Sequence, residues 1–139
     1  MSIEEQQELK QKSYAEALRY MNNAKETLRK AKKEDKFYTN RRLVRIACER
    51  AYKGVLLALD AYLTLNDVEL PTKKCRSIDF YTMWKIEEID DMLPKYWVTV
   101  HSILCLGGHS GHSLDSVVLH AAFANAYEII NKIKPAGCD

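Results

Sequence analysis

A cysteine and three of the four histidines follow one another closely in the last third of the chain. His101, Cys105, His109 and His112 are separated by four, four and three residues. Thiolate and imidazole are side chains that bind zinc, so Cys105, His109 and His112 are the candidate metal ligands of this sequence. Three glycines interrupt the segment and no carboxylate lies within it, which favours an ordinary connection between two helices. We therefore expect no bound metal and no other cofactor.

Basic side chains are concentrated between positions 25 and 53, where eleven Lys and Arg stand against four Asp and Glu, a local net charge of +7. Phe37, Tyr38 and Tyr52 lie in the same stretch, and aromatic rings of this kind can stack on nucleic-acid bases. The candidate nucleic-acid-binding residues are Arg41, Arg42, Arg45 and Lys53. The alternative is a solvated helical hairpin whose charge balances an acidic segment further along the chain.

The basic stretch overlaps two segments with helical periodicity. In the first, apolar residues recur every three or four positions from Tyr14 to Ala31, so they form one stripe along a helix. Its start is open between Ser2 and Ser13, because each is followed three residues later by Glu, the spacing of a capping box. We favour the start at Ser2. A charged hinge over residues 32–36 follows this helix.

The second helix is predicted from Thr39 or Asn40 to Leu65, and one of its stripes consists of small residues. The stripe is formed by Ala47, Ala51, Gly54, Ala58 and Ala61. Because a glycine in the middle of a helix costs about 1 kcal/mol relative to alanine, Gly54 indicates a place where another backbone approaches closely. That backbone belongs to a helix of the same chain or, as the alternative, to a second copy in a homodimer.

Three more helical segments complete the chain. One begins near Ser77 or Asp79 and ends or bends at Pro94, a second covers 96–106, and the last runs from a cap at Ser113 to about Lys134. The acidic residues Glu87, Glu88, Asp90 and Asp91 are expected to form a solvated outer surface. No segment alternates apolar and polar residues, so we expect no β-sheet. The sequence predicts an all-α fold, an up-and-down antiparallel bundle of four to five helices.

A chain of 139 residues fits a single domain, residues 1–139 with a core over roughly 13–134, and its net charge of +2 selects no class of partner. The longest apolar run, Val55 to Leu59, is far shorter than the roughly 20 residues that cross a bilayer. The first residues are acidic and polar, unlike a secretion signal. The four cysteines, Cys48, Cys75, Cys105 and Cys138, are spread evenly, which favours reduced thiols. We expect a cytoplasmic protein with Cys48 buried on an apolar helix face.

Two stretches carry a resemblance to a known group of proteins: Tyr14 to Ala31, and Arg45 to Leu59 with the sequence RIACERAYKGVLLAL. In the second stretch, small residues precede an aromatic position, a lysine and an aliphatic run, and the helix leads into Leu70–Lys74. In these features the chain resembles the HEPN superfamily of bacterial helical bundles. It is most similar to an uncharacterised family within that group, a domain of unknown function. The resemblance covers most of residues 13–134 and implies a helical bundle.

Many HEPN proteins are ribonucleases, so the resemblance also implies an active site with Arg and His a few positions apart. In such a site histidine moves the proton of a ribose hydroxyl, and arginine stabilises the charge that develops on the phosphate. In the corresponding region of this chain, Lys95 to His101, lysine stands in place of arginine, and lysine lacks the forked geometry that contacts two phosphate oxygens. We interpret the ribonuclease motif as absent, and His101 is the candidate catalytic residue of a divergent enzyme only.

The sequence therefore favours a non-catalytic, cytoplasmic helical-bundle protein that acts through protein–protein contacts, most simply as a homodimer. The alternative is suggested by the basic stretch and by the HEPN resemblance. It is an RNA- or nucleotide-binding protein of a defence or toxin–antitoxin system, or a divergent ribonuclease.

Overall fold

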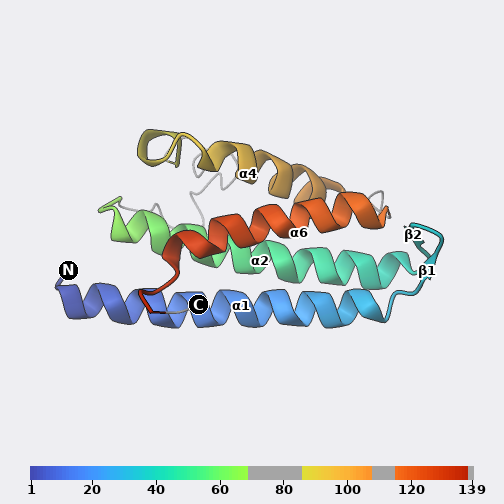
Figure 1. Cartoon of the computed structure of the whole chain (residues 1–139), viewed down its shortest axis with the longest axis horizontal. Helices are drawn as coiled ribbons and strands as arrows, with labels where there is room; N and C mark the ends of the chain where they lie inside the picture. The colour runs from blue at the N-terminus through green and yellow to red at the C-terminus, as the bar shows by residue number, and fades with distance from the viewer. Residues whose placement is uncertain (69–85, 108–114, 138–139) are drawn as a thin grey trace.

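The fold is a bundle of antiparallel helices, which confirms the all-α prediction. The computed structural model describes residues 1–68, 86–107 and 115–137. The helices are α1 (Ile3–Arg29), α2 (Arg41–Leu65), α4 (Leu93–Val100) and α6 (Ser116–Ile130); a π-helix, η1 (His101–Gly107), continues α4, and a 3-10 turn, η2 (Asn131–Ile133), ends α6. Successive helices run in opposite directions along the bundle (Figure 1). None of the described helices is long and apolar enough to cross a membrane.

The first helix begins at the earlier of the two predicted starts. The backbone N–H of Glu5 donates to Oγ of Ser2 at 3.1 Å, and the backbone N–H of Ser2 donates to Oε1 of Glu5 at 3.4 Å. This reciprocal capping box satisfies two N–H groups that the helix itself leaves unpaired. Ser13, the alternative start, lies buried in the middle of α1. With 27 residues, α1 is about 40 Å long.

The close contact of α1 with α2 is made by the predicted stripe of small residues. Ala47, Ala51, Gly54, Ala58 and Ala61 are all buried. A Cβ atom added to Gly54 would lie 3.1 Å from the carbonyl oxygen of Ala17 and 3.1 Å from Cβ of Tyr20. The stripe therefore packs inside the chain, as the intramolecular interpretation predicted. A homodimer, which stays a prediction, needs another surface.

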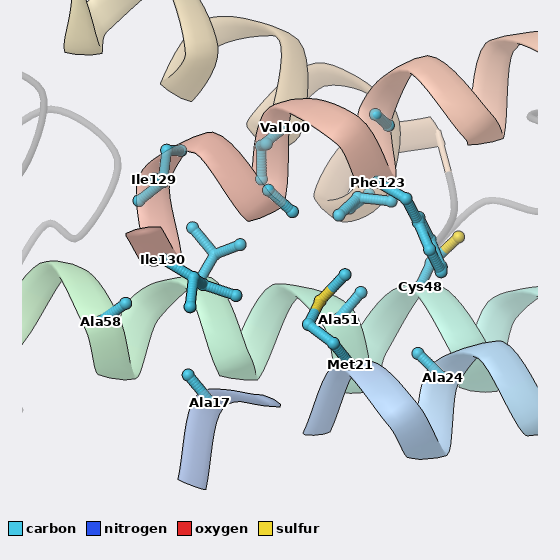
Figure 2. Close-up of a cluster of buried hydrophobic side chains, with 14 of the residues drawn as sticks. Ala17, Met21, Ala24, Cys48, Ala51, Ala58, Val100, Phe123, Ile129 and Ile130 are labelled. Atoms are coloured by element: carbon cyan, nitrogen blue, oxygen red, sulfur yellow. The ribbon is translucent and has the colours of Figure 1, made fainter. Parts of the chain in front are cut away.

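The last helix, α6, completes the core above this helix pair. Figure 2 shows Phe123 and Ile130 of α6 directed toward Met21 of α1 and Cys48 of α2, and all four side chains are buried. Burial raises the pKa of the Cys48 thiol to about 12. Cys48 is therefore a small core residue with a protonated thiol at neutral pH, and its predicted burial is confirmed.

A short β-hairpin joins α1 to α2, where the sequence predicts a charged hinge and no sheet. The strands β1 (Lys33–Glu34) and β2 (Phe37–Tyr38) are antiparallel, with Lys33 opposite Tyr38 and Glu34 opposite Phe37. Lys32 and Asp35 have left-handed backbone conformations, with φ of 49° and 57°. The expectation of no sheet is wrong here, because strands of two residues are too short to produce an alternating sequence pattern.

The later helices begin and end at residues other than those predicted. Pro94 lies in the first turn of α4, where a helix does not need its N–H, and the helical residues 86–89 end before it. The cap of α6 is Asp115, whose Oδ1 accepts a hydrogen bond from the N–H of Val117 at 2.8 Å. The predicted cap, Ser113, lies outside the described residues, and so does most of the helix predicted from 77 or 79 to Pro94.

An ion pair connects the segment before α4 to the end of α6. Nζ of Lys132 lies 2.8 Å from Oδ2 of Asp90, and Oδ1 of Asp90 accepts a hydrogen bond from the N–H of Met92 at 3.0 Å. The hydrogen bond between the two side chains lowers the pKa of Asp90 and raises the pKa of Lys132. Asp90, predicted to belong to the solvated acidic surface, is instead paired, and its side chain is only 16% exposed.

The close approach at Gly54 predicts a large effect of adding a side chain there. Gly54→Val should lower the free energy of unfolding by about 1–3 kcal/mol, because the added group is forced against the backbone of α1. Lys53→Val is the matched control: it adds the same side chain at the preceding, exposed position and should cost less than about 1 kcal/mol. Urea unfolding followed by circular dichroism measures both variants. Equal losses in the two would contradict the close helix crossing.

The Asp90–Lys132 pair predicts a pH-dependent contribution to stability. The pKa of Asp90 is lower in the folded protein than its unfolded value of about 3.9, so the pair stabilises the fold at neutral pH and loses this contribution as the pH falls below about 4. Asp90→Asn should lower the free energy of unfolding by about 1–2 kcal/mol at pH 7 and by less at pH 3, because the contribution of the pair decreases as the pH falls from the unfolded toward the folded pKa of Asp90. Asp91→Asn, at an exposed position, is the control. A deficit of Asp90→Asn that is the same at both pH values would show that charge is not its cause.

Candidate functional site

The predicted metal ligands lie partly outside the described residues. Cys105 is half-buried on η1, whereas His109 and His112 belong to the segment 108–114, which the structure does not describe. Within the described ranges, no group of three or more His, Cys, Asp or Glu side chains is placed to hold a metal ion. The expectation that this segment binds no metal therefore stays a prediction.

His101, the candidate of a divergent ribonuclease, lies among aromatic side chains. It is half-buried at the start of η1, and its ring centroid is 5.7 Å from that of Trp97 and 6.2 Å from that of Tyr52. Tyr52 and Trp97 stack on each other at 5.8 Å. These contacts join α2 to α4 and η1, so His101 contributes to the packing between these elements.

The four predicted nucleic-acid-binding residues are exposed on α2, but the structure does not gather them around a cavity. Arg41, Arg42, Arg45 and Lys53 all lie on the surface. Arg50 and Gly54 mark the side of α2 that faces α1, since Nη1 of Arg50 donates to Oγ1 of Thr27 at 2.8 Å. Tyr52 marks the side that faces α4. Arg45, two helical turns before Tyr52, lies on that same side, away from α1.

Other members of the basic stretch line a groove between α1 and α6. Beside the hairpin, residues of the two helices line a cavity of about 580 Å³. At the hairpin, the N–H of Ser116 donates to the carbonyl of Lys36 at 2.8 Å; further along α1, the hydroxyl of Tyr14 donates to Oδ1 of Asn131 at 3.4 Å. Along α6, these two contacts are made before and after the residues that line the groove, at Ser116 and at Asn131. The lining residues are Lys25, Leu28, Arg29, Lys32, Lys33, Tyr38, Leu119, His120, Phe123, Ala124 and Tyr127.

The groove has a basic rim and an apolar floor. Four cations come from α1 and the hairpin, His120 comes from α6, and none of the lining residues, all in the described part of the chain, is acidic. Nζ of Lys25 lies 4.6 Å from the ring centroid of Tyr127, and Nζ of Lys33 lies 5.8 Å from that of Tyr38. Arg29 also pairs with Glu26 on its own helix, but both side chains are well exposed, so this pair holds Arg29 only weakly.

Tyr38 is the more buried of the two tyrosines that line the groove. It is 7% exposed, and burial raises its pKa above the ordinary value. A tyrosine hydroxyl is protonated at neutral pH even at its ordinary pKa of about 10. The floor thus supplies neutral aromatic and aliphatic surface, and the rim supplies positive charge.

Sequence reasoning finds the basic stretch, but the four residues that it selects do not line this groove, and their role in binding nucleic acid stays a prediction. Lys25, Arg29 and Lys32 are spaced by four and three residues, and Leu119, Phe123 and Tyr127 are each four apart. These spacings place each set on one side of its own helix. They were a usable signal for two facing stripes, one basic and one apolar, but nothing in the sequence indicated that the two helices face each other.

The fold and this groove define the class of the protein: an all-α bundle with a basic groove between its first and last helices. The chain belongs to the family described as Domain of unknown function (DUF5618), whose family model matches residues 12–135. Among solved structures, a protein of unknown function from Dyadobacter fermentans is 35% identical to it, with a TM-score of 0.78 over 88% of this chain and 94% of that chain. No curated protein matches the chain. The predicted membership of an uncharacterised family is confirmed.

Proposed function

We propose that this protein is a non-catalytic binding protein whose groove between α1 and α6 takes a small organic anion of the nucleotide kind, a flat ring joined to phosphate. The observation that carries the proposal is the combination of four cations on the rim with tyrosine rings beneath two of them. This is the nucleotide-binding alternative that the basic stretch suggested, assigned to a different set of side chains.

The rim supports an anionic ligand for electrostatic reasons. Lys25, Arg29, Lys32 and Lys33 are gathered around one cavity without an acidic lining residue, so their mutual repulsion decreases when an anion lies between them. An apolar floor strengthens each charge–charge contact, because it excludes part of the water that screens it. Several cations suit a ligand with more than one negative charge, such as a phosphate chain.

The floor supports a flat ring on the same ligand. The ammonium groups of Lys25 and Lys33 lie over the rings of Tyr127 and Tyr38, and long lysine side chains can turn toward an anion. The ring face that Lys25 leaves is then open to stacking, which contributes about 1–3 kcal/mol per base. A cavity of about 580 Å³ is within the usual size of small-molecule sites.

A mononucleotide fits this groove better than a strand of RNA. The hairpin contacts α6 on one side of the groove, and Tyr14 contacts Asn131 further along α1, whereas a strand needs a channel that is open along its length. Membership of the HEPN superfamily, a defence or toxin–antitoxin role and a location in the cytoplasm stay predictions, and the groove does not depend on them.

The proposal predicts that ATP binds and that the groove residues set its affinity. Calorimetric titration at low salt should give tighter binding of ATP than of adenosine or tripolyphosphate, because only ATP uses both rim and floor. Lys25→Gln with Lys33→Gln should weaken ATP binding by about tenfold or more. Tyr127→Leu should reduce the preference for ATP over tripolyphosphate.

The matched control removes the same charge elsewhere. Arg42→Gln with Lys53→Gln changes two exposed cations that do not line the groove, so it should leave ATP affinity within about twofold of the parent. An equal loss in the two double variants would mean that net charge alone attracts the nucleotide, and the groove would then not be the site. Absence of ATP binding by the parent protein would reject the proposal outright.

A second candidate function is contact with a second copy of the chain, the homodimer that the sequence suggested. Three exposed apolar side chains support it: Phe37 of the hairpin is 48% exposed, and Val117 and Val118 of α6 are 66% and 38% exposed. They are close together, because Phe37 forms an isolated β-bridge with Asp115, two residues before Val117. Exposed apolar groups that lie together favour contact with another protein surface.

The dimer proposal predicts a concentration-dependent mass. Light scattering on a sizing column should show dimer at high protein concentration, and Phe37→Ser with Val117→Ser should shift the equilibrium toward monomer. Val98→Ser, which removes an equally exposed apolar side chain from α4 (50% exposed), should not. A strict monomer at the highest concentration would reject the proposal.

A further inference from the structure

The hairpin between α1 and α2 supplies part of the groove, but it has little structure of its own. It contributes Lys33 and Tyr38 to the lining, and its strands contain only two residues each. An isolated two-stranded hairpin is marginally stable at best in water. The position of these two groove residues therefore depends on what holds the hairpin in place.

The start of α6 holds it through two contacts. In the β-bridge between Phe37 and Asp115, the N–H of Ser116 donates to the carbonyl of Lys36 at 2.8 Å, and Oδ2 of Asp115 lies 3.8 Å from Nζ of Lys36. Asp115 also caps α6, because its Oδ1 accepts a hydrogen bond from the N–H of Val117 at 2.8 Å. One carboxylate thus caps α6 and also lies beside the ammonium group of Lys36 at the tip of the hairpin.

We propose that Asp115 is a positioning residue for the groove: by holding the hairpin against α6, it places Lys33 and Tyr38 where an anionic ligand meets them. As far as ligand binding is concerned, this inference rests on the proposed function. Asp115 itself does not line the groove. Without the contact between its carboxylate and Lys36, only the backbone contact of Ser116 with Lys36 links the tip of the hairpin to α6, so Lys33 and Tyr38 are held less firmly.

The sign of the effect distinguishes positioning from simple electrostatics. Asp115→Asn removes a negative charge near a groove for anions, so electrostatics alone predicts tighter binding of ATP. Positioning predicts weaker binding, by about two- to fivefold, the equivalent of one partly exposed ion pair. Asparagine is as good a helix cap as aspartate, so the start of α6 is retained in this variant.

The experiment is a double-mutant cycle on the full chain with Asp115→Asn and Lys36→Met, titrated with ATP. We expect each single variant to bind ATP more weakly and the double variant to bind no more weakly than the singles, because both remove the same contact. Tighter binding by Asp115→Asn together with weaker binding by Lys36→Met would overturn the proposal in favour of long-range charge. Glu128→Gln, at an exposed position of α6, is the control for a neutralised carboxylate.

A ligand-free measurement separates this proposal from the proposed function. Amide hydrogen exchange of Ser116, bonded to the carbonyl of Lys36, and of Thr39, bonded to that of Lys32 at 3.1 Å, reports whether the hairpin is held. Both should exchange faster in Asp115→Asn, whereas amides in the middle of α6 should not change. Unchanged exchange at Ser116 and Thr39 would overturn the positioning role even if ATP binds. If both amides exchange faster in Asp115→Asn but the parent protein does not bind ATP, the proposed ligand is rejected and the role of Asp115 in holding the hairpin is retained.

Discussion

The close approach of α1 and α2 is the constraint on which the rest of the structure depends. At Gly54 the two backbones are so near that a single methyl group would have to displace the carbonyl of Ala17 or Cβ of Tyr20. A tight pair of long helices needs little side-chain volume between them, so the larger apolar side chains of α2 remain available to α4, η1 and α6. The helix pair is thus a narrow platform. The apolar side chains of α2 that do not contact α1 determine where α4, η1 and α6 pack.

The groove follows from that platform. The last helix packs its apolar side chains, such as Phe123 and Ile130, into the core above α1 and α2, and near the hairpin a cavity lies between it and α1. The side chains that face each other across the gap are lysines on α1 and aromatic rings on α6. Lys25 lies over the ring of Tyr127, so its alkyl stem packs on apolar surface and its ammonium group interacts with the face of the ring. This interaction offsets part of the repulsion between the cations of the rim in the folded protein.

Local signals in the sequence predicted the local structure well. The capping box at Ser2 and the cap at Asn40 depend on residues within one helical turn, and the packing of Gly54 depends on a helix that directly precedes it in the chain. The groove is lined by residues from the ranges 25–38 and 119–127, and no local sequence pattern predicts which side of α6 faces α1. Arg41, Arg42 and Arg45 were selected because charge is dense around them, but density along the chain does not determine which side of a helix faces a cavity.

The same distinction explains why the hairpin was missed although it matters for the site. Its two pairs of strand residues carry no periodicity of their own. Its contacts with α6, made by the N–H of Ser116 and the carboxylate of Asp115, come from about eighty residues further along the chain. A segment of this kind has its structure imposed by its surroundings. It follows that a change at the start of α6 acts on groove residues that it does not touch, so the affinity of the groove is set partly by contacts made outside it.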